Sequence, residues 1–214
     1  MKIDFQKKSF IDYIAQGVSI LLHPLFLPLY TVIIYFYVSP RYFLHQNINS
    51  LIYYLLIISI AIPLLFLIVL KFTKIIENSK LKTTRERLFF SVIMTSVYFI
   101  IFNKLIIYHD YIELFPFFFG IFLSLAMLSV LNYQKLKPSI HAVGVSGMLT
   151  FFLLWSYYSR INILSILYAL IMLSTFAIAT RLYLQEHSFR EIVMGLIIGV
   201  SMQIIAFFYI LEFY

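Results

Sequence analysis

Seven long apolar runs occupy most of this 214-residue chain and leave few ways for it to fold. Each run has about 20 residues, which as a helix matches a bilayer core roughly 30 Å thick. An outer-membrane barrel would instead show alternating segments of about 10 residues. The pattern therefore predicts membrane-spanning helices. The runs cover residues 17–38, 51–71, 88–107, 114–132, 142–159, 161–180 and 191–211.

The composition supports the same fold class. Hydrophobic residues make up 63% of the chain and charged residues 12%, whereas soluble domains have roughly 25% charged residues. We predict an all-α, polytopic membrane helix bundle with about seven transmembrane helices, six at the fewest. It forms a single transmembrane domain over 1–214, with two N-terminal helices within 17–72 and a motif-bearing core over about 80–212. The N-terminus lacks a small-residue cleavage site, so we expect no cleaved signal peptide.

Lysine and arginine are divided unequally between the two sides that seven crossings define. The N-terminal side also holds the connections at 72–87, 133–141 and 181–190, and it carries 13 of the 16 Lys and Arg residues. By the positive-inside rule this side is cytoplasmic. We expect an inner (plasma) membrane protein of a bacterium, with its N-terminus inside and its C-terminus outside. The net charge of +7 then reflects topology and attraction to anionic lipid, and nucleic acid is not an expected partner.

The connection "TRLYLQEHSFREI", residues 180–192, places a compact polar set between two apolar runs. His187 and Glu191 are four residues apart and so share one helical face, and Arg181 can approach His187 from the preceding helix end. A carboxylate that accepts one imidazole N–H leaves the other nitrogen as a nucleophile or base. Ser188 and Glu191 also fit a capping box, which would only stabilise the helix start. Both interpretations stay open.

The connection "KPSIHAVG", residues 137–144, opens another apolar run. Backbone N–H groups at a helix start bind anions, and the Ser139 hydroxyl would add a donor. His141, in the first turn, could protonate a leaving oxygen. The alternative is that Ser139 only caps the helix and that His141 is an interfacial residue.

The connection "KLKTTRERL", residues 80–88, is basic. The planar guanidinium of arginine suits phosphate oxygens, although positive-inside charge alone would also explain the cluster. All three connections lie on one membrane face. A charge costs about 3 kcal/mol at the bilayer centre, so a site built from them should lie at the interface and meet a lipid headgroup.

Together, these connections resemble the motifs of the type 2 phosphatidic acid phosphatase superfamily, the lipid phosphate phosphatases. The family motifs read Lys-x6-Arg-Pro, then Pro-Ser-Gly-His, then Ser-Arg-x5-His-x3-Asp. The resemblance spans about residues 80–192, and "LLHPLFLPLY", residues 21–30, is similar to the first helix of small Bacteroidetes-type members. The matching positions are Lys80, Arg87, Pro138, Ser139, His141, Arg181 and His187, with Glu191 at the aspartate position.

The resemblance implies a membrane-embedded phosphatase that hydrolyses a lipid phosphate or diphosphate without a metal or other cofactor. His187 would attack phosphorus and form a phosphohistidine, Glu191 would orient it, and His141 would protonate the leaving oxygen. Lys82 and Arg85 are alternatives to the cations matched in the first motif. The residues implied to bind the phosphate are Lys80, Arg87, Ser139 and Arg181.

Four positions depart from the family pattern. Leu88 replaces proline, Thr180 replaces serine and Glu191 replaces aspartate. Ile140 in place of glycine is the largest change, because a β-branched residue rejects a positive φ. These departures leave open a catalytically inactive relative that binds anionic lipid headgroups or supports a membrane complex. A transporter or channel is a third hypothesis, but no charged residue lies deep in a run and no paired broken helices are evident.

The remaining features are interpreted as structural. Gly195 and Gly199, with Gly144 and Gly147 on another run, favour close helix packing. His23 precedes a proline in the first run, and we expect a structural role for it. The chain has no cysteine, so it forms no disulfide. Its scattered histidines lack metal-ligand spacing, and no metal site is expected.

Overall fold

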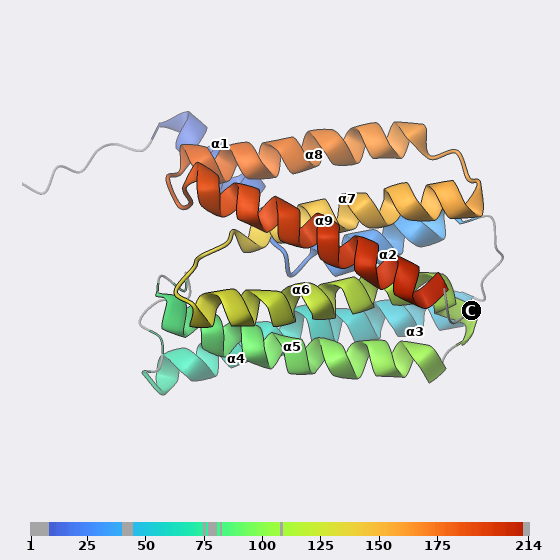
Figure 1. Ribbon diagram of the computed structural model, residues 1–214, viewed down its shortest axis with the longest axis horizontal. Coiled ribbons are helices and arrows are strands. Elements are labelled where there is room, and N and C mark those ends of the chain that lie inside the picture. Colours follow the sequence, from blue (N-terminus) through green and yellow to red (C-terminus); the bar gives the residue numbers. More distant parts are fainter. Residues whose placement is uncertain are drawn as a thin grey trace, which may run out of the picture.

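The computed structural model describes residues 9–39, 45–74, 76, 81, 83–107 and 109–211. All regular secondary structure in these ranges is helical, which confirms the predicted all-α bundle (Figure 1). A π-helical segment, η1 (Leu56–Ala61), joins α3 to α4, and a 3₁₀ segment, η2 (His109–Leu114), precedes α6. The helices are α1 (Phe10–Leu21), α2 (Leu27–Val38), α3 (His45–Leu55), α4 (Ile62–Phe72), α5 (Thr84–Ile107), α6 (Phe115–Tyr133), α7 (Ile140–Ser159), α8 (Leu164–Tyr183) and α9 (Phe189–Leu211).

Five helical segments of the described chain are long and apolar enough to cross a bilayer. Large apolar side chains such as Phe72 and Tyr157 are 83% and 79% exposed, as lipid-facing residues would be. The chain is therefore an integral membrane protein. The helix α5 has 24 residues, or about 36 Å, and packs along α6. The five spans are Ile48–Phe72, Ile112–Tyr133, Ile140–Ser159, Leu164–Tyr183 and Phe189–Ile210.

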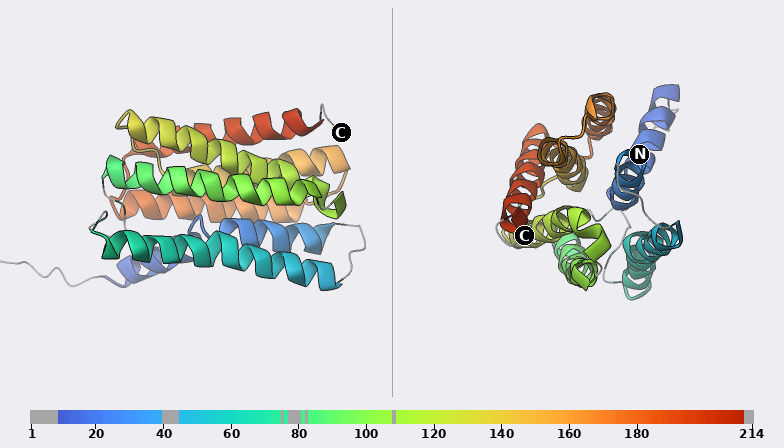
Figure 2. Two further views of the ribbon diagram at one scale, coloured as in Figure 1. Left: turned by 90° about the horizontal axis from the view of Figure 1, so that it is seen from below. Right: turned by 90° about the vertical axis from the view of Figure 1, so that its right-hand side faces the viewer.

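The first predicted span, 17–38, is not one continuous helix. It is divided into α1 and α2, which follow one another along the long axis (Figure 2), and α1 packs against α8. Pro24 explains the break, because proline lacks an N–H group and disfavours helical geometry in the residue before it. Within the break, the Leu25 N–H donates to Nδ1 of His23 at 3.3 Å.

Buried aromatic residues form the core between α2, α6 and α7. The ring centroids of Phe117 and Phe151 lie 5.2 Å apart, as do those of Tyr35 and Trp155. Tyr35 and Trp155 both donate a hydrogen bond to the Glu113 carboxylate, each at 3.0 Å. This carboxylate therefore joins α2, the start of α6 and α7 at one end of the bundle.

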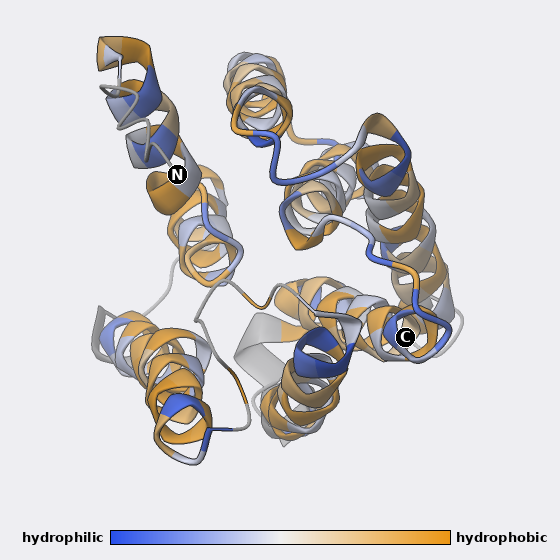
Figure 3. Ribbon diagram, turned by 90° about the vertical axis from the view of Figure 1, so that its left-hand side faces the viewer, coloured by the Kyte–Doolittle hydropathy of each residue, from blue (hydrophilic) through white to orange (hydrophobic). Residues whose placement is uncertain are grey.

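The three motif-bearing connections lie together at the other end of the bundle. The end of α4, the start of α5 and the α6–α7 and α8–α9 connections are all at the left of Figure 1, as seven crossings predict. Figure 3 looks onto this end, where hydrophilic connections face the viewer and the helices behind them are mostly apolar. The fold thus brings polar segments that are distant in sequence to one face.

Glycines allow α7 and α9 to pack closely, which confirms that role for Gly195 and Gly199. A Cβ on Gly195 would lie 2.6 Å from the Ser139 carbonyl oxygen, and one on Gly199 would clash with the Val143 carbonyl. Gly144, which was expected to share this interface, instead faces Leu27 and packs α7 against α2. The interface between α7 and α9 therefore has no room for even a methyl group at two positions.

Substitution Gly199→Ala should destabilise the bundle, because the added methyl group overlaps the backbone of α7. We expect a loss of about 1–3 kcal/mol, seen as a lower melting temperature in detergent. Gly17→Ala is the matched control, because a Cβ there has nothing within 4 Å and alanine favours helix. Equal melting temperatures for the two variants would contradict the packing interpretation.

Candidate functional site

The start of α7 lies beside the first two turns of α9. The Ser139 N–H donates to the Glu191 carbonyl at 3.0 Å, and the Ser139 carbonyl faces Gly195. The Ser139 hydroxyl is completely buried and has no hydrogen-bond partner among the described residues. It does not cap the helix through its side chain. Ser139 therefore presents a buried polar group with an unused hydrogen-bonding capacity.

Ile140 begins α7 without backbone strain. The residues with positive φ in the described chain are elsewhere, and Ile140 is the first residue of a regular helix. The concern that a β-branched residue conflicts with a positive φ at this position therefore does not apply. Its side chain packs beside the small cluster of Leu128, Val143 and Ile198.

A tight turn carries His187 into the bundle. Gln185 adopts φ 52° in this turn, and the Glu186 N–H donates to the Arg181 carbonyl at 3.2 Å. The chain then reverses into α9, and the His187 side chain is only 4% exposed. A histidine in a short polar connection is thus buried and not solvated.

Glu191 both caps α9 and contacts His187, so both interpretations of the connection at 180–192 apply. Its carboxylate accepts from the Ser188 N–H at 3.1 Å, and its own N–H donates to the Ser188 hydroxyl at 3.4 Å, which completes a capping box. The same carboxylate oxygen lies 2.9 Å from Nδ1 of His187. Helix capping therefore holds the carboxylate in the position from which it orients the imidazole.

The hydrogen bond sets the chemistry of the His187 ring. A carboxylate only accepts, so Nδ1 carries the proton and Nε2 keeps the lone pair. Burial, the largest influence, lowers the pKa of His187 below its ordinary 6.5. Hydrogen bonding to Glu191 raises this pKa in part, while Arg87 and Arg181 lower it further. The ring is therefore neutral at neutral pH, with a nucleophilic nitrogen.

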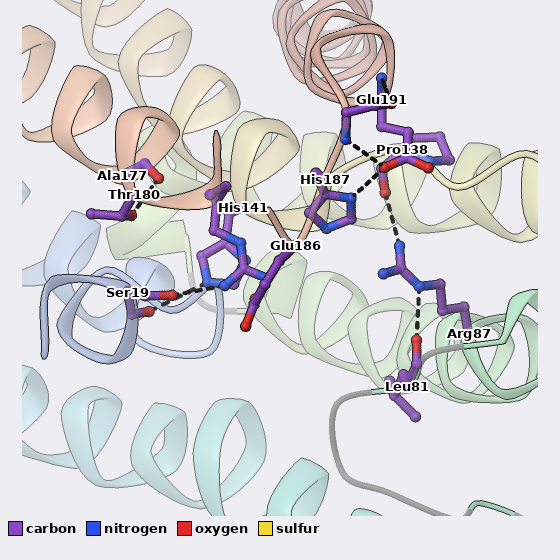
Figure 4. A network of polar contacts seen from close by, with 12 residues as sticks. Ser19, Leu81, Arg87, Pro138, His141, Ala177, Thr180, Glu186, His187 and Glu191 are labelled. Atoms are coloured by element: carbon purple, nitrogen blue, oxygen red, sulfur yellow. Dashed lines mark hydrogen bonds and ion pairs between the residues drawn. The ribbon is translucent and has the colours of Figure 1, made fainter. Parts of the chain in front are cut away.

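His141 lies within electrostatic reach of His187, and the two rings are seen together in Figure 4. His141 is 7% exposed, and its Nε2 faces the Ser19 carbonyl at 3.4 Å. A nitrogen that faces a carbonyl must carry a proton. The second and third motifs therefore meet, with one histidine from each.

Two arginines flank these histidines. Arg181 forms an ion pair with Glu186, and one of its terminal nitrogens donates to the Ser19 hydroxyl at 2.8 Å. Its Nε is buried without a partner among the described residues. Arg87 donates to the Leu81 carbonyl at 2.9 Å and to the Pro138 carbonyl at 3.4 Å, near Glu191 (Figure 4). Guanidinium groups from α5 and α8 thus lie on the same cluster.

Other predicted positions are placed differently. Lys80 and Lys82 lie outside the described residues. Arg85 is exposed, with its guanidinium 5.9 Å from the Phe89 ring centroid. The Thr180 hydroxyl donates to the Ala177 carbonyl of its own helix. Among the described residues, no three His, Asp or Glu side chains are placed to hold a metal ion.

The end of α1 and the break after it contribute two residues that the motif analysis missed, Ser19 and His23. Ser19 contacts both Arg181 and His141, and the His23 ring lies edge to face with the His141 ring at 5.1 Å and 85°. A structural role was expected for His23, and its ring also contacts a motif residue. The His-Pro pair was a signal for the break, but nothing in the sequence marked Ser19.

His187 should titrate with a midpoint below 6.5 in an NMR experiment on ¹⁵N-histidine-labelled protein. At neutral pH its Nδ1 should carry the proton. Substitution Arg87→Gln removes a cation that lowers this pKa, so the midpoint should move upward. An unchanged or lower midpoint in a folded Arg87→Gln protein would show that Arg87 is too far away to matter.

Comparisons with protein-family models, curated proteins and solved structures gave no match for this chain.

Proposed function

We propose that this protein is a membrane-embedded phosphatase, similar to the type 2 phosphatidic acid phosphatases, that hydrolyses a lipid phosphate or diphosphate. The observation that carries the proposal is the partly buried hydrogen bond between His187 and Glu191, 2.9 Å long, beside Arg87, Arg181 and His141. A neutral imidazole surrounded by guanidinium groups combines a nucleophile with a site for a phosphate dianion.

In the first step, the Nε2 lone pair of His187 attacks phosphorus. The phosphorus–oxygen bond to the lipid breaks, and the leaving oxygen takes a proton from the protonated form of His141. Glu191 stabilises the positive charge that develops on the His187 ring, as an acidic partner does for an imidazole. Arg87 and Arg181 offset charge on the equatorial phosphate oxygens, and the buried Ser139 hydroxyl offers a further donor.

In the second step, water attacks the phosphohistidine. His141 takes a proton from that water, the phosphorus–nitrogen bond breaks, and inorganic phosphate leaves. The neutral His187 and the protonated His141 are then restored. A lipid diphosphate would follow the same path and yield the lipid monophosphate.

Substitution His187→Ala should abolish phosphate release from lipid phosphate or diphosphate in detergent micelles that contain EDTA. Loss of a nucleophile should reduce kcat by at least about a thousandfold. The panel includes phosphatidic acid, phosphatidylglycerol phosphate and a polyprenyl diphosphate. His45→Ala is the matched control, because His45 begins α3 at the opposite end of the bundle.

Rapid quenching of the wild type should also trap acid-labile phosphate on the protein. Turnover that survives His187→Ala would refute the assignment of the nucleophile. Lipid binding without turnover by the wild type would instead support an inactive headgroup-binding relative. The ordinary helical start at Ile140 removes one reason to expect that outcome.

We further propose that the site faces the cytoplasm of a bacterium, with the N-terminus inside and the C-terminus outside. The 13 Lys and Arg residues on the motif side support this orientation. The native chain has no cysteine, so single cysteines at the exposed positions Lys135 and Arg160 can report the sides directly. In intact cells, a membrane-impermeant maleimide should label only the cysteine at 160. Labelling only at 135 would reverse the orientation.

A further inference from the structure

The break between α1 and α2 lies against the site although it belongs to none of the three motifs. Ser19, in the last turns of α1, is 8% exposed. Its hydroxyl accepts a hydrogen bond from Arg181 at 2.8 Å, and its carbonyl oxygen lies 3.4 Å from Nε2 of His141. One residue thus contacts both a proposed phosphate-binding residue, Arg181, and the proposed acid, His141, which lies beside Ser19 in Figure 4.

The contact with Arg181 orients a flexible cation. Arg181 is also paired with Glu186, and together these two partners fix the plane of its guanidinium group. Its Nε–H has no partner among the described residues and can donate a hydrogen bond to a ligand oxygen. A guanidinium that is oriented before the ligand arrives loses less side-chain entropy when it binds.

His23 provides an uncharged wall for His141. Its Nδ1 accepts a hydrogen bond from the Leu25 N–H. A proton on Nδ1 would place two donors face to face and break this bond, so the contact favours the neutral ring. The neutral ring meets His141 edge to face at 5.1 Å. An aromatic ring in this arrangement limits the rotation of its neighbour and tolerates a positive charge on it, whereas a second charged ring would repel that charge.

We propose that Ser19 and His23 are positioning residues for this reaction, with separate tasks. The Ser19 hydroxyl holds Arg181 for the phosphate, and the His23 ring, with the Ser19 carbonyl, holds His141 for proton donation. The inference rests on the proposed phosphatase activity. It makes the end of α1 and the break after it, which precede all the motif residues in the chain, part of the functional site.

The two tasks predict changes in different kinetic parameters, KM for Ser19 and kcat for His23. Ser19→Ala removes the hydroxyl but keeps the backbone carbonyl, so KM should rise by about tenfold, the typical effect of a hydrogen bond to a charged group, with little change in kcat. Ser19→Thr keeps a hydroxyl and should restore KM. His23→Ala should instead lower kcat by about tenfold, part of what general acid catalysis contributes, with KM unchanged. His23→Phe keeps an uncharged ring and should retain most of the wild-type kcat.

Ser174→Ala is the matched control for the loss of a buried membrane serine hydroxyl. Ser174 is also 8% exposed, and it lies on α8 two turns before Arg181. Its kinetics should equal those of the wild type. Melting temperatures in detergent identify any variant that fails to fold, and Ser19→Thr and His23→Phe then carry the test alone.

Three results would overturn the inference. Wild-type kinetics in both alanine variants would show that the contacts do not matter. A joint change of kcat and KM in both variants, in proportion to the loss of melting temperature, would show a role in general packing. A His23→Phe protein as slow as His23→Ala would remove the role of the ring. In each case an active wild type leaves the phosphatase proposal intact, whereas an inactive wild type overturns both.

Discussion

The close approach of α7 and α9 is the constraint on which the site depends. Gly195 lies against the Ser139 carbonyl, and the Ser139 N–H bonds to the Glu191 carbonyl. These two contacts fix the start of α7 relative to the carboxylate that holds His187. In a bilayer, helices gain little from burying apolar surface against each other, so backbone proximity and hydrogen bonds supply much of the association. The glycines therefore serve stability and site geometry together.

The charged groups and histidines of the site can lie next to the membrane because each has an ion-pair or hydrogen-bond partner close by. Arg181 has Glu186 and Ser19, Arg87 has two backbone carbonyls, and His187 has Glu191. Unpaired charge this close to hydrocarbon would cost several kcal/mol, so pairing is a condition for placing cations here. Five buried side-chain atoms have no hydrogen-bond partner in the described chain, and two of them are the Ser139 hydroxyl and Nε of Arg181. These two belong to the proposed phosphate site, where each can donate a hydrogen bond to a phosphate oxygen.

Much of this arrangement could be predicted from the residues, and the reasons are local. Run length and composition indicated the spanning helices, and the i, i+4 spacing indicated the contact between His187 and Glu191. The glycine stripe on α9 indicated close packing but not which glycine on α7 would meet it. The role of Ser19 could not be predicted, because it depends on where the α1–α2 break lands against α8. A lone serine in an apolar run carries no signal of such a long-range contact.

The carboxylate of Glu113 has a consequence for motion. Hydrogen bonds from Tyr35 and Trp155 anchor the far end of α2, while Gly144 seats its near end against α7. Because α2 is held at both ends, it cannot slide along the membrane normal. Any shift of α1 relative to α2 would therefore have to be absorbed by residues 22–26, the short break between the two helices.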